Sequence, residues 1–510
     1  MDTKALRQKI LDLAIRGKLV PQNPNDEPAS ILLEKIREQK QQMFKEGKLK
    51  KKDIKNDSII FKGEDNLHYE KFQDGTVKCI EDEIPFEVPE GWNWARLRDI
   101  CMMSAGKSKS TDQIKSEPFE GSYPCFGGNG VRGYVDEYNQ DGIFSIVGRQ
   151  GALCGNINIA IGKFYATEHA VVTTLFDGID FKWSNYILEA LRLNNYATGA
   201  AQPGLSVANI LNVFVPVPPT QEQDRIGNNV YESLKIVEAL EQEKIDLQKI
   251  IIAAKTKILD LAIRGKLVPQ DPNDEPASVL LERIRAEKEE LIKQGKIKRD
   301  KKESVIFKGD DNSYYEKIGN KLNCIDEQLP FKLPDGWSYE RLGNICSIAR
   351  GGSPRPIENY LTDAEDGLNW IKIGDTEQGG KYIYSTKEKI RPEGVSKTRY
   401  VHCGDFLLTN SMSFGRPYIL KTDGCIHDGW LVIGDVEAVF IQDYLYYMLS
   451  SSIMYDLLSR LAAGSTVKNL KSDSVKSLIV PIPPRKEQDK ISKHIENVFS
   501  IISLIEESLN

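Results

Sequence analysis

Apolar residues recur every three or four positions along one long stretch in the middle of the chain. The stretch follows Pro218 and Pro219 and covers residues 221–264. This period predicts a single amphipathic helix, roughly 65 Å long at ~1.5 Å per residue. Its start carries a capping-box pattern (Thr220 with Gln223), and Gly265 is a suitable stop. A helix of this length with one apolar stripe needs a partner helix, and the stripe that would pack on it is Ile226, Val230, Leu234, Val237, Ile251, Ala254, Ile258 and Leu261.

Two sequence repeats indicate where that partner lies. KILDLAIRGKLVPQ begins at Lys9 and again at Lys257, and VPVPPTQEQDRI from Val215 returns as VPIPPRKEQDKI from Val480. The two ends of the chain therefore resemble the two halves of the central helix. The simplest interpretation is a second copy of this helix, cut in the middle, with its halves at opposite ends of the sequence. Two such copies lying antiparallel give an internal two-fold axis, and the extent of the identity disfavours two unrelated helices.

A second helix with its own apolar stripe follows each copy of that repeat. Each of these helices leads into a basic run, at residues 48–55 and 296–302. Such a run is either the solvated end of a helix or a phosphate contact. Each copy then continues through an Ile-Phe-Lys-Gly segment to a Gly-Trp entry, where Trp92 and Trp337 are expected to anchor a core.

Two domains of α/β type are expected at residues 83–214 and 328–479. Short alternating runs such as GIFSIVG and GDFLLTN predict their strands, and each domain closes with a helical segment. The frame of the two domains repeats but their contents differ, which suits a protein that reads two different things from one scaffold. The expected organisation is residues 1–60 for half of the split long helix with an accessory helix, 61–214 for the first variable domain, 215–305 for the central long helix with its accessory helix, 306–479 for the second variable domain, and 480–510 for the other half of the split helix.

The amino-acid composition limits the cellular compartment and the class of protein. The 510 residues are 40% hydrophobic and 28% charged, with a net charge of −6, which is typical of a soluble globular protein. No apolar run has the length of a membrane span, and the amphipathic N-terminus lacks a signal-peptide pattern. Eight scattered cysteines without a CxxC pair indicate neither zinc nor disulfides, so we expect a cytoplasmic protein. Two repeat-equivalent pairs, Cys79 with Cys324 and Cys101 with Cys346, are expected in the core.

Three matches to enzyme motifs fail on inspection. Residues 126–130 fit a methyltransferase glycine loop, but no acidic residue stands at the usual place before it and strand-like sequence follows. Residues 106–108 read Gly-Lys-Ser, yet Cys101 holds the place of the earlier glycine that a phosphate-binding loop requires. His169 and His427 lack metal-ligand spacing and a nucleophile beside them. We therefore expect no catalytic site, no metal and no cofactor.

Polar, glycine-rich loops are the remaining candidates for a functional site in the two domains. Arginine pairs with guanine, and asparagine or glutamine with adenine, in the major groove of DNA. The alternative is that these loops are simply turns. The candidates for base contact are Asn129, Arg132, Arg149 and Gln150 in the first domain, and Ser353, Arg355, Lys372, Asn410, Ser411, Ser413 and Arg416 in the second.

These features together resemble the specificity subunits of type I restriction–modification systems. The resemblance rests on the doubled ILDLAIRGKLVPQ, the paired PxPPxxEQDxI helix starts and the two variable domains entered by Gly-Trp. YPCFGGNGVRGYVDEY and TEHAVV look like one class of target recognition domain, and GDFLLTNSMSFG looks like another. Arg149 and Gln150 depart from the first class, where acidic residues are common, so its half-site is not carried over.

The resemblance implies an α+β fold with two α/β target recognition domains separated by long antiparallel helices, and a protein without catalysis of its own. Each domain would read half of a bipartite double-stranded DNA target, and the spacer would set the gap. Two methyltransferase subunits would dock, and ATP-dependent restriction subunits would join. The alternatives are a self-contained enzyme, a coiled-coil scaffold that binds only protein, and a specificity subunit that works with a different nuclease.

Overall fold

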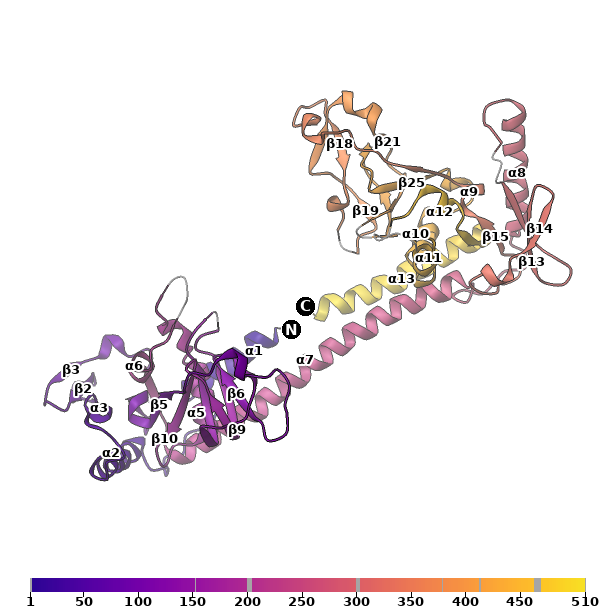
Figure 1. The fold of residues 1–510 in the computed structure, drawn as a ribbon. Coiled ribbons are helices and arrows are strands. Elements are labelled where there is room, and N and C mark those ends of the chain that lie inside the picture. The colour runs from indigo at the N-terminus through magenta and orange to yellow at the C-terminus, as the bar shows by residue number, and fades with distance from the viewer. Residues whose placement is uncertain are drawn as a thin grey trace. The chain divides into compact units, whose positions relative to one another are not determined.

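The chain forms two compact units, residues 1–245 and 246–510, and the long helix α7 (Thr220–Ile263) contributes to both. The computed structural model describes residues 2–151, 153–199, 204–299, 303–377, 379–411, 414–462 and 469–509. Each unit contains a part of α7, a terminal helix, a small accessory module and a recognition domain (Figure 1). Among the described residues, no helix is both long and apolar enough to cross a membrane.

In the first unit, α1 (Thr3–Ile15) runs antiparallel to the first part of α7. Arg7 near the start of α1 forms an ion pair of 3.3 Å with Glu238, while Gln22 beyond its end donates to Glu222 at 3.2 Å. Residue numbers therefore increase along one segment in the direction in which they decrease along the other, so the two segments are antiparallel. Their shared core contains, from the predicted stripe, Ile226, Val230, Leu234 and Val237, all buried, together with Ile10, Leu11, Ala14 and Ile15 of α1.

The second unit repeats this pairing with α13 (Arg485–Leu509) and the second part of α7. Lys255 pairs with Glu506 at 2.7 Å, and Gln270 donates to Glu487 at 3.0 Å, so these segments are also antiparallel. The central helix therefore has the two chain ends as its partners, one in each unit. On this part of α7 the buried residues are Ile251, Leu259, Ala262 and Ile263, whereas Ala254, Ile258 and Leu261 of the predicted stripe are half-buried.

The capping box predicted at the start of α7 differs from what the structure shows. Gln223 is fully buried, and its amide donates to the Pro218 carbonyl and accepts from the Asp180 backbone. Thr220 donates its hydroxyl to the Gly178 carbonyl at 3.2 Å instead of capping the helix. The physical reason is tertiary, because the helix start is packed against the recognition domain, whose backbone groups compete for these side chains. Gln488 of α13 repeats the arrangement with Pro483 and Ile441.

A repeated glycine follows α1 and the second part of α7, and at Gly265 it is the stop that the sequence predicted. Gly17 and Gly265 both have positive φ, +65° and +63°. A side chain at either would collide with a proline ring, because an added Cβ would lie 2.4 Å from Cγ of Pro89 or Pro334. The glycine therefore serves both the left-handed turn and the close approach of the Gly-Trp entry. As predicted, Trp92 and Trp337 are buried beside it.

Each accessory module pairs one helix with a three-stranded antiparallel meander. Basic side chains from the two predicted runs are already paired locally, since Lys48 bonds Glu46 at 2.8 Å and Arg299 bonds Glu289 at 2.6 Å. The first module comprises α2 (Ala29–Lys45), α3 (Lys51–Ile54), β1 (Ser58–Lys62), β2 (His68–Phe72) and β3 (Val77–Cys79); the second comprises α8 (Ala277–Lys293), β12 (Ser304–Lys308), β13 (Tyr314–Ile318) and β14 (Lys321–Cys324).

The prediction that the repeat-equivalent cysteines lie in the core is confirmed for one pair and wrong for the other. Cys101 and Cys346 are buried, but Cys79 and Cys324 are exposed. Each exposed cysteine lies on the edge strand of its meander, opposite Tyr69 or Tyr315. Repetition in both copies predicts core packing, yet each meander has an outer face that no described segment covers.

The first recognition domain is built on a six-stranded sheet in the order β5-β10-β8-β9-β6-β7. Its neighbours are antiparallel except for β6 and β9, which are parallel. A short pair, β4 with β11, ties the entry of the domain to its exit. The elements are β4 (Asn93–Arg96), α4 (Leu97–Ile100), β5 (Cys101–Ala105), β6 (Tyr123–Gly127), β7 (Gly130–Val135), β8 (Gln140–Gly148), β9 (Ile157–Ala166), β10 (Ala170–Leu175), α5 (Phe181–Ala190), α6 (Val207–Leu211) and β11 (Phe214–Val217).

The second recognition domain has two five-stranded sheets, β16-β25-β22-β23-β19 and β17-β20-β18-β24-β21. The entry and exit strands β15 and β26 pair as β4 and β11 do. Its elements are β15 (Ser338–Arg341), α9 (Leu342–Ile345), β16 (Ser347–Arg350), β17 (Leu361–Thr362), β18 (Leu368–Ile371), β19 (Tyr382–Ile383), β20 (Glu388–Ile390), β21 (Arg399–Val401), β22 (Phe406–Thr409), β23 (Pro417–Leu420), β24 (Gly424–Ile426), β25 (Trp430–Gly434), α10 (Gln442–Ser450), α11 (Ser452–Leu461), α12 (Ser472–Lys476) and β26 (Ile479–Ile482). The frame is thus common to both domains, while the sheets differ.

Candidate nucleic-acid interface

Three loops of the first recognition domain come together beside the ends of β6, β8 and β9. The turn between β6 and β7 lies very close to the end of β8, since an added Cβ on Gly148 would lie 1.9 Å from the Gly128 carbonyl oxygen. The Arg149 backbone donates to the His169 carbonyl at 3.1 Å. Asn156 donates its side-chain amide to Asn129 at 3.1 Å. Sequence positions that are some 40 apart therefore form one polar surface.

Exposure separates the candidates on this surface. Asn129, Arg132 and Gln150 are exposed, whereas Arg149 is half-buried. The Arg132 guanidinium donates to the Thr111 hydroxyl at 3.0 Å, which holds it along β7. The structure thus brings all four candidates of this domain into one region. Asn156 was not among the predicted residues, and the only sequence signal for it is its place directly after the glycine-containing segment 148–155.

Asp428 organises the corresponding region of the second domain. Its carboxylate accepts from the Ser353 hydroxyl at 2.8 Å and from Arg355 at 3.3 Å. Its carbonyl accepts from the Asn410 amide at 2.7 Å and from Arg350 at 2.9 Å. Although burial works in the opposite direction, the hydrogen bond from Ser353 and the neighbouring His427 lower the pKa of Asp428. An ionised carboxylate therefore orients the polar side chains here, and the sequence analysis missed it.

The remaining candidates of the second domain do not form one cluster. Arg355 is exposed, Ser353 and Ser411 are half-buried, and Asn410 is fully buried with its amide bonded to backbone. Lys372 follows β18 and forms an ion pair with Glu388. Arg416 is exposed and lines a cavity of about 840 Å³ between the β22–β23 turn and the helices α7 and α13. Ser413 lies outside the described residues.

Residues of the enzyme-like motifs have structural roles in the two domains. Residues 126–130 form the tight turn from β6 into β7, so the segment after the glycines is a strand, as the sequence suggested. An added Cβ on Gly106 would lie 2.1 Å from the Ala166 carbonyl oxygen, which means that this glycine permits close packing on β9. Burial lowers the pKa of His427, whose Nδ1 accepts from the Gly429 backbone at 2.8 Å. These contacts account structurally for the two glycine motifs and for His427.

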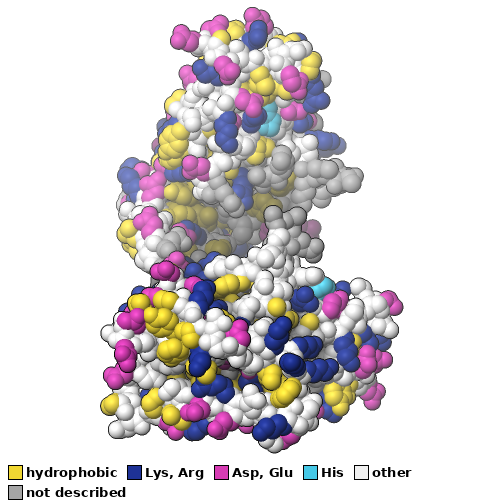
Figure 2. Space-filling model, turned by 90° about the vertical axis from the view of Figure 1, so that its left-hand side faces the viewer, with side chains coloured by type: hydrophobic (Ala, Val, Ile, Leu, Met, Phe, Trp, Pro, Cys, Tyr) yellow, Lys and Arg dark blue, Asp and Glu magenta, His cyan; other side chains and the backbone are white. Residues whose placement is uncertain are grey.

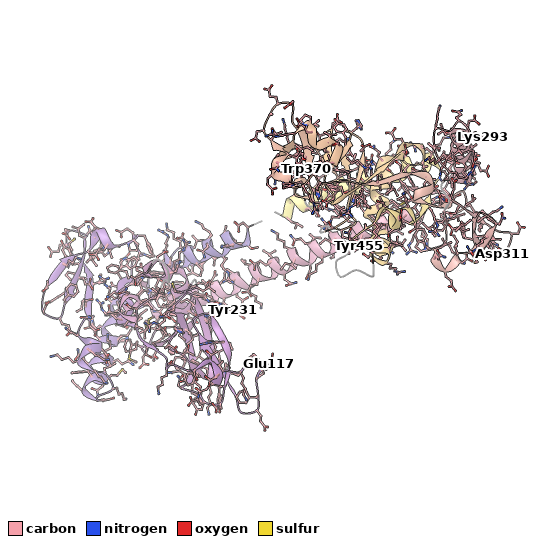
Figure 3. The ribbon with its side chains drawn as sticks, turned by 45° about the horizontal axis from the view of Figure 1, so that its top comes forward. Glu117, Tyr231, Lys293, Asp311, Trp370 and Tyr455 are labelled. Carbon is pink, nitrogen blue, oxygen red and sulfur yellow. The ribbon has the colours of Figure 1, made fainter. Side chains whose placement is uncertain are left out.

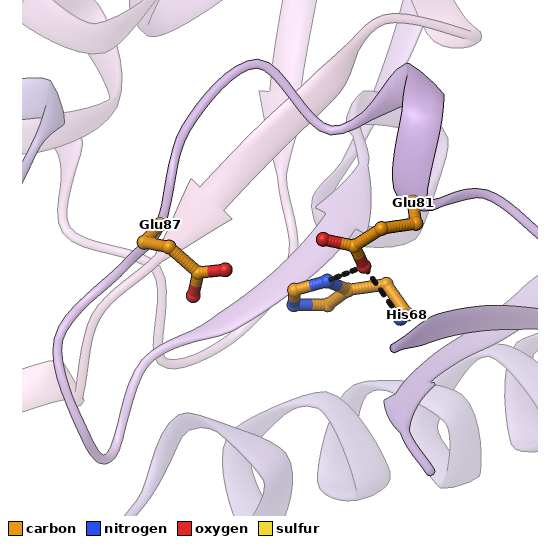
Figure 4. Close-up of side chains that lie close together, drawn as sticks. All are labelled: His68, Glu81 and Glu87. Atoms are coloured by element: carbon orange, nitrogen blue, oxygen red, sulfur yellow. Dashed lines mark hydrogen bonds and ion pairs between the residues drawn. The ribbon is translucent and has the colours of Figure 1, made fainter. Parts of the chain in front are cut away.

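One group of side chains meets a geometric test for metal ligands among the described residues. His68, Glu81 and Glu87 offer ligand atoms within 4.8 Å of one another (Figure 4). Glu81 already accepts from the His68 ring at 2.7 Å and from its backbone at 2.8 Å. In the other module, Asp326 accepts from the Tyr314 backbone at 2.7 Å with no histidine present. The group therefore has a structural use that does not require a metal.

Comparison with known proteins decides the family. The model of the type I restriction modification DNA specificity domain matches residues 89–254 and 334–510. The chain belongs to this family of DNA specificity subunits. The matched segments cover both recognition domains, so this specificity subunit has two of them, as the resemblance implied.

Individual relatives agree with this assignment. The chain is 27% identical to the EcoEI specificity subunit of Escherichia coli, over 99% of this chain and 90% of that one. It is 30% identical to the EcoAI specificity subunit of Escherichia coli, over 68% of this chain and 63% of that one. A chain from a solved structure of the type I R-M system has a TM-score of 0.51 at 15% identity, over 83% of this chain and 94% of that one, and supports the fold.

Proposed function

We propose that each recognition domain of this specificity subunit reads one half of a bipartite double-stranded DNA target. One observation carries the proposal: two units share the same spacer pairing, entry and exit, but present different polar loops. The base-reading side chains would be the exposed or half-exposed candidates, namely Asn129, Arg132, Arg149 and Gln150 for one half-site, and Ser353, Arg355, Lys372, Ser411 and Arg416 for the other. Asn410 would support its loop through its bond to Asp428.

Energetics favour a division of the task between two domains. Each wrong base pair typically costs ~1–3 kcal/mol, so several read positions are needed to separate a target from random DNA. The helix α7 connects both units and would set the gap between the half-sites. The proposed boundaries are residues 61–214 and 306–479 for the recognition domains, with the spacer and accessory elements in 1–60, 215–305 and 480–510.

Catalysis in this proposal belongs to partner subunits. Two methyltransferase subunits would dock on the two units, and ATP-dependent restriction subunits would join them. Support comes from the side chains themselves, because His427 accepts from the Gly429 backbone and Gly106 packs closely against the Ala166 carbonyl, both of which are structural contacts. The chain would act in the cytoplasm, where the DNA and these partners are.

A long-read methylation map tests the function. Cells would co-express this chain with its methyltransferase subunit, and the control would omit this chain. We expect one new bipartite methylated motif that is lost in the control. Replacing residues 93–214 by the equivalent domain of a relative should change one half-site only. The scaffold alternative gains support if a folded, bound methyltransferase produces no motif, and the modular assignment fails if both half-sites change.

A further inference from the structure

Each accessory meander presents an apolar and aromatic face to the outside. Residues directly opposite one another in an antiparallel sheet share a face. In the first meander, Phe61 lies opposite Tyr69, which lies opposite Cys79. A second row on the same face joins β1, β2 and β3 through Lys71. We call this set the outer face; it comprises Ile59, Phe61, Tyr69, Lys71, Val77 and Cys79 in the first unit, and Val305, Phe307, Tyr315, Lys317, Leu322 and Cys324 in the second.

The outer faces are accessible despite their composition. Phe61 and Val77 are 39% and 50% exposed, and Phe307 and Leu322 are 42% and 58% exposed. Phe61 stacks on Tyr69 with ring centroids 5.9 Å apart, and Phe307 stacks on Tyr315 at 6.1 Å. Hydrophobic side chains gather among lysines and arginines on the surface of the first unit in the lower part of Figure 2. Such clustering marks an interaction surface more often than a scattered exposed residue does.

The inner face of each meander holds the outer face in place. Arg96 forms an ion pair with the buried Glu70 at 2.6 Å, and Arg341 repeats it with the buried Glu316. The same arginines donate to the carbonyls of Asn212 and Ser477, each at 2.6 Å. The two meanders are therefore fixed to equivalent positions of their recognition domains, and the outer faces are presented in the same way twice.

The two outer faces keep the same chemistry although other surface positions differ between the copies. Exposed Gln42 on α2 corresponds to exposed Glu290 on α8, and Lys78 on the inner side of β3 corresponds to Asn323. The outer faces instead retain a phenylalanine, a tyrosine, a lysine and a cysteine at matching positions. Core packing does not explain this, since these side chains point outward. Binding of a partner to both faces would explain why these residues are retained.

A cavity borders each outer face at its first strand. Ile59 and Arg37 line one of about 200 Å³, and Val305 and Arg285 line the other, of about 420 Å³. The matching lining residues are Leu33 with Leu281 and Ser58 with Ser304. Each surface thus combines a flat aromatic area, one lysine and an arginine-lined recess, the features of a protein interface with a central anchor.

We propose that each outer face, with its adjoining cavity, docks one methyltransferase subunit, so that one chain takes two copies of that subunit at equivalent sites. The proposal rests on the proposed function, which requires two such subunits. The docked surface would supply apolar side chains against Phe61 or Phe307 and a carboxylate near Lys71 or Lys317. A phosphate backbone is a poor fit, because each outer face has a single lysine among aliphatic and aromatic side chains. In the second cavity, Arg285 and Arg299 are already paired with carboxylates.

The docking sites lie away from the candidate base-reading loops. Within the second unit, Figure 3 places Asp311, at the turn of the meander, and Trp370, beside Lys372, at opposite ends. Lys293, at the end of α8, lies on the same side as Asp311. A subunit bound at the meander therefore leaves the recognition loops open to DNA.

The exposed cysteines of the outer faces provide a direct test with the full-length chain. Cys79, Cys324 and Cys403 are all exposed, but Cys403 belongs to the second recognition domain. We would measure the rate of N-ethylmaleimide labelling of each by mass spectrometry, with and without the methyltransferase subunit. We expect at least tenfold slower labelling of Cys79 and Cys324 in the complex, with Cys403 unchanged.

Two substitutions add a readout of stoichiometry. Phe61→Ser and Phe307→Ser should each leave a complex with one methyltransferase subunit, and the double variant should bind none. Ile161→Ser is the matched control, since Ile161 is 72% exposed on β9 of the recognition domain. Light scattering after size exclusion gives the mass of each complex, and thermal melting confirms that each variant is folded.

The outcomes separate this proposal from the proposed function. Two bound subunits with unprotected Cys79 and Cys324 would overturn the docking site and leave the function standing. Protection by DNA alone, or only by the restriction subunit, would overturn the choice of occupant. A wild-type chain that binds no methyltransferase subunit would remove the proposed function, and the docking site with it.

Discussion

Gln270 and Glu487 are 217 residues apart in the chain, yet Gln270 Nε2 donates to Glu487 Oε1 at 3.0 Å. Gln22 and Glu222 repeat the bond at 3.2 Å in the other unit. In both cases the glutamine follows the Gly-Lys-Leu-Val-Pro segment and the glutamate opens a spacer helix. This bond fixes the register in which a terminal segment of the chain meets the central helix.

Removing the Glu487 carboxylate should destabilise the second unit. Glu487 is buried and also accepts from the Trp337 indole at 2.9 Å. Glu487→Ala leaves the buried Trp337 indole N–H without a partner, which costs ~1–3 kcal/mol, whereas the exposed Gln270 amide keeps its bond to the Gly265 carbonyl at 2.6 Å. Urea unfolding followed by tryptophan fluorescence should show the loss. Glu506→Ala, which removes only the partly exposed pair with Lys255, should cost under ~1 kcal/mol; equal costs for the two variants would contradict the argument.

The repeated glycine at the end of α7 should tolerate no side chain. Gly265→Ala faces both the positive φ and the Pro334 ring at 2.4 Å, whereas Gly295 has a φ of +70° and nothing within 4 Å. We expect Gly295→Ala to lose ~1–2 kcal/mol from the backbone alone. Gly265→Ala should lose clearly more, because the proline and Trp337 must move. Equal midpoints of denaturation would show that the proline contact is unimportant.

Asp99 should make the first unit less stable as the pH rises. Burial raises its pKa from 3.8 to about 6, against the hydrogen bond from the Arg96 backbone. The folded state therefore binds the proton more tightly, so stability falls between about pH 4 and pH 6 and the full cost is present above pH 6. Asp99→Asn should remove up to about 3 kcal/mol of this cost at pH 7.5 and change little at pH 4.

The second unit shows that asparagine fits this position. Asn344 is the repeat equivalent of Asp99, and its amide donates to the Ser304 carbonyl at 2.9 Å. Urea unfolding at pH 4 and pH 7.5 measures the effect in the full-length chain. A gain that is the same at both pH values would indicate better packing and not the loss of a buried charge.

Lengthening the spacer should lengthen the gap in the DNA target. The α1 core lies at residues 226–237 of α7 and the α13 core at 259–263, so four residues inserted beside Asp246 leave both intact. They add about 6 Å, comparable with the rise of one to two base pairs at ~3.4 Å each. A methylation map should show unchanged half-sites with a longer gap. An unchanged gap would mean that α7 does not set the spacing.

Single loop arginines should each act on one half-site. Arg132 and Arg355 are both exposed, one in each recognition domain. Replacing either by alanine should lower discrimination at its own half-site by ~1–3 kcal/mol per base pair that it reads. Competition binding with DNA altered in one half-site at a time gives this number. A uniform loss across both half-sites would indicate a phosphate contact.

The sequence by itself determined the frame of this protein. Helical period, helix stops and repeated segments are local signals, so the long helix, its split partner and the two variable domains were predictable from the sequence, in agreement with the two segments that match the family. Gly265 ended the helix where the pattern placed the stop because its left-handed turn is a property of one residue and its neighbours.

Only the tertiary structure decided what the individual polar side chains do. Asn410 and Arg355 look alike as loop residues, but one is buried against Asp428 and the other is exposed. Gln223 fits a capping box, but it bonds to the recognition domain instead. Exposure and hydrogen-bond partners depend on which distant segments cover a loop, and no local pattern carries that information.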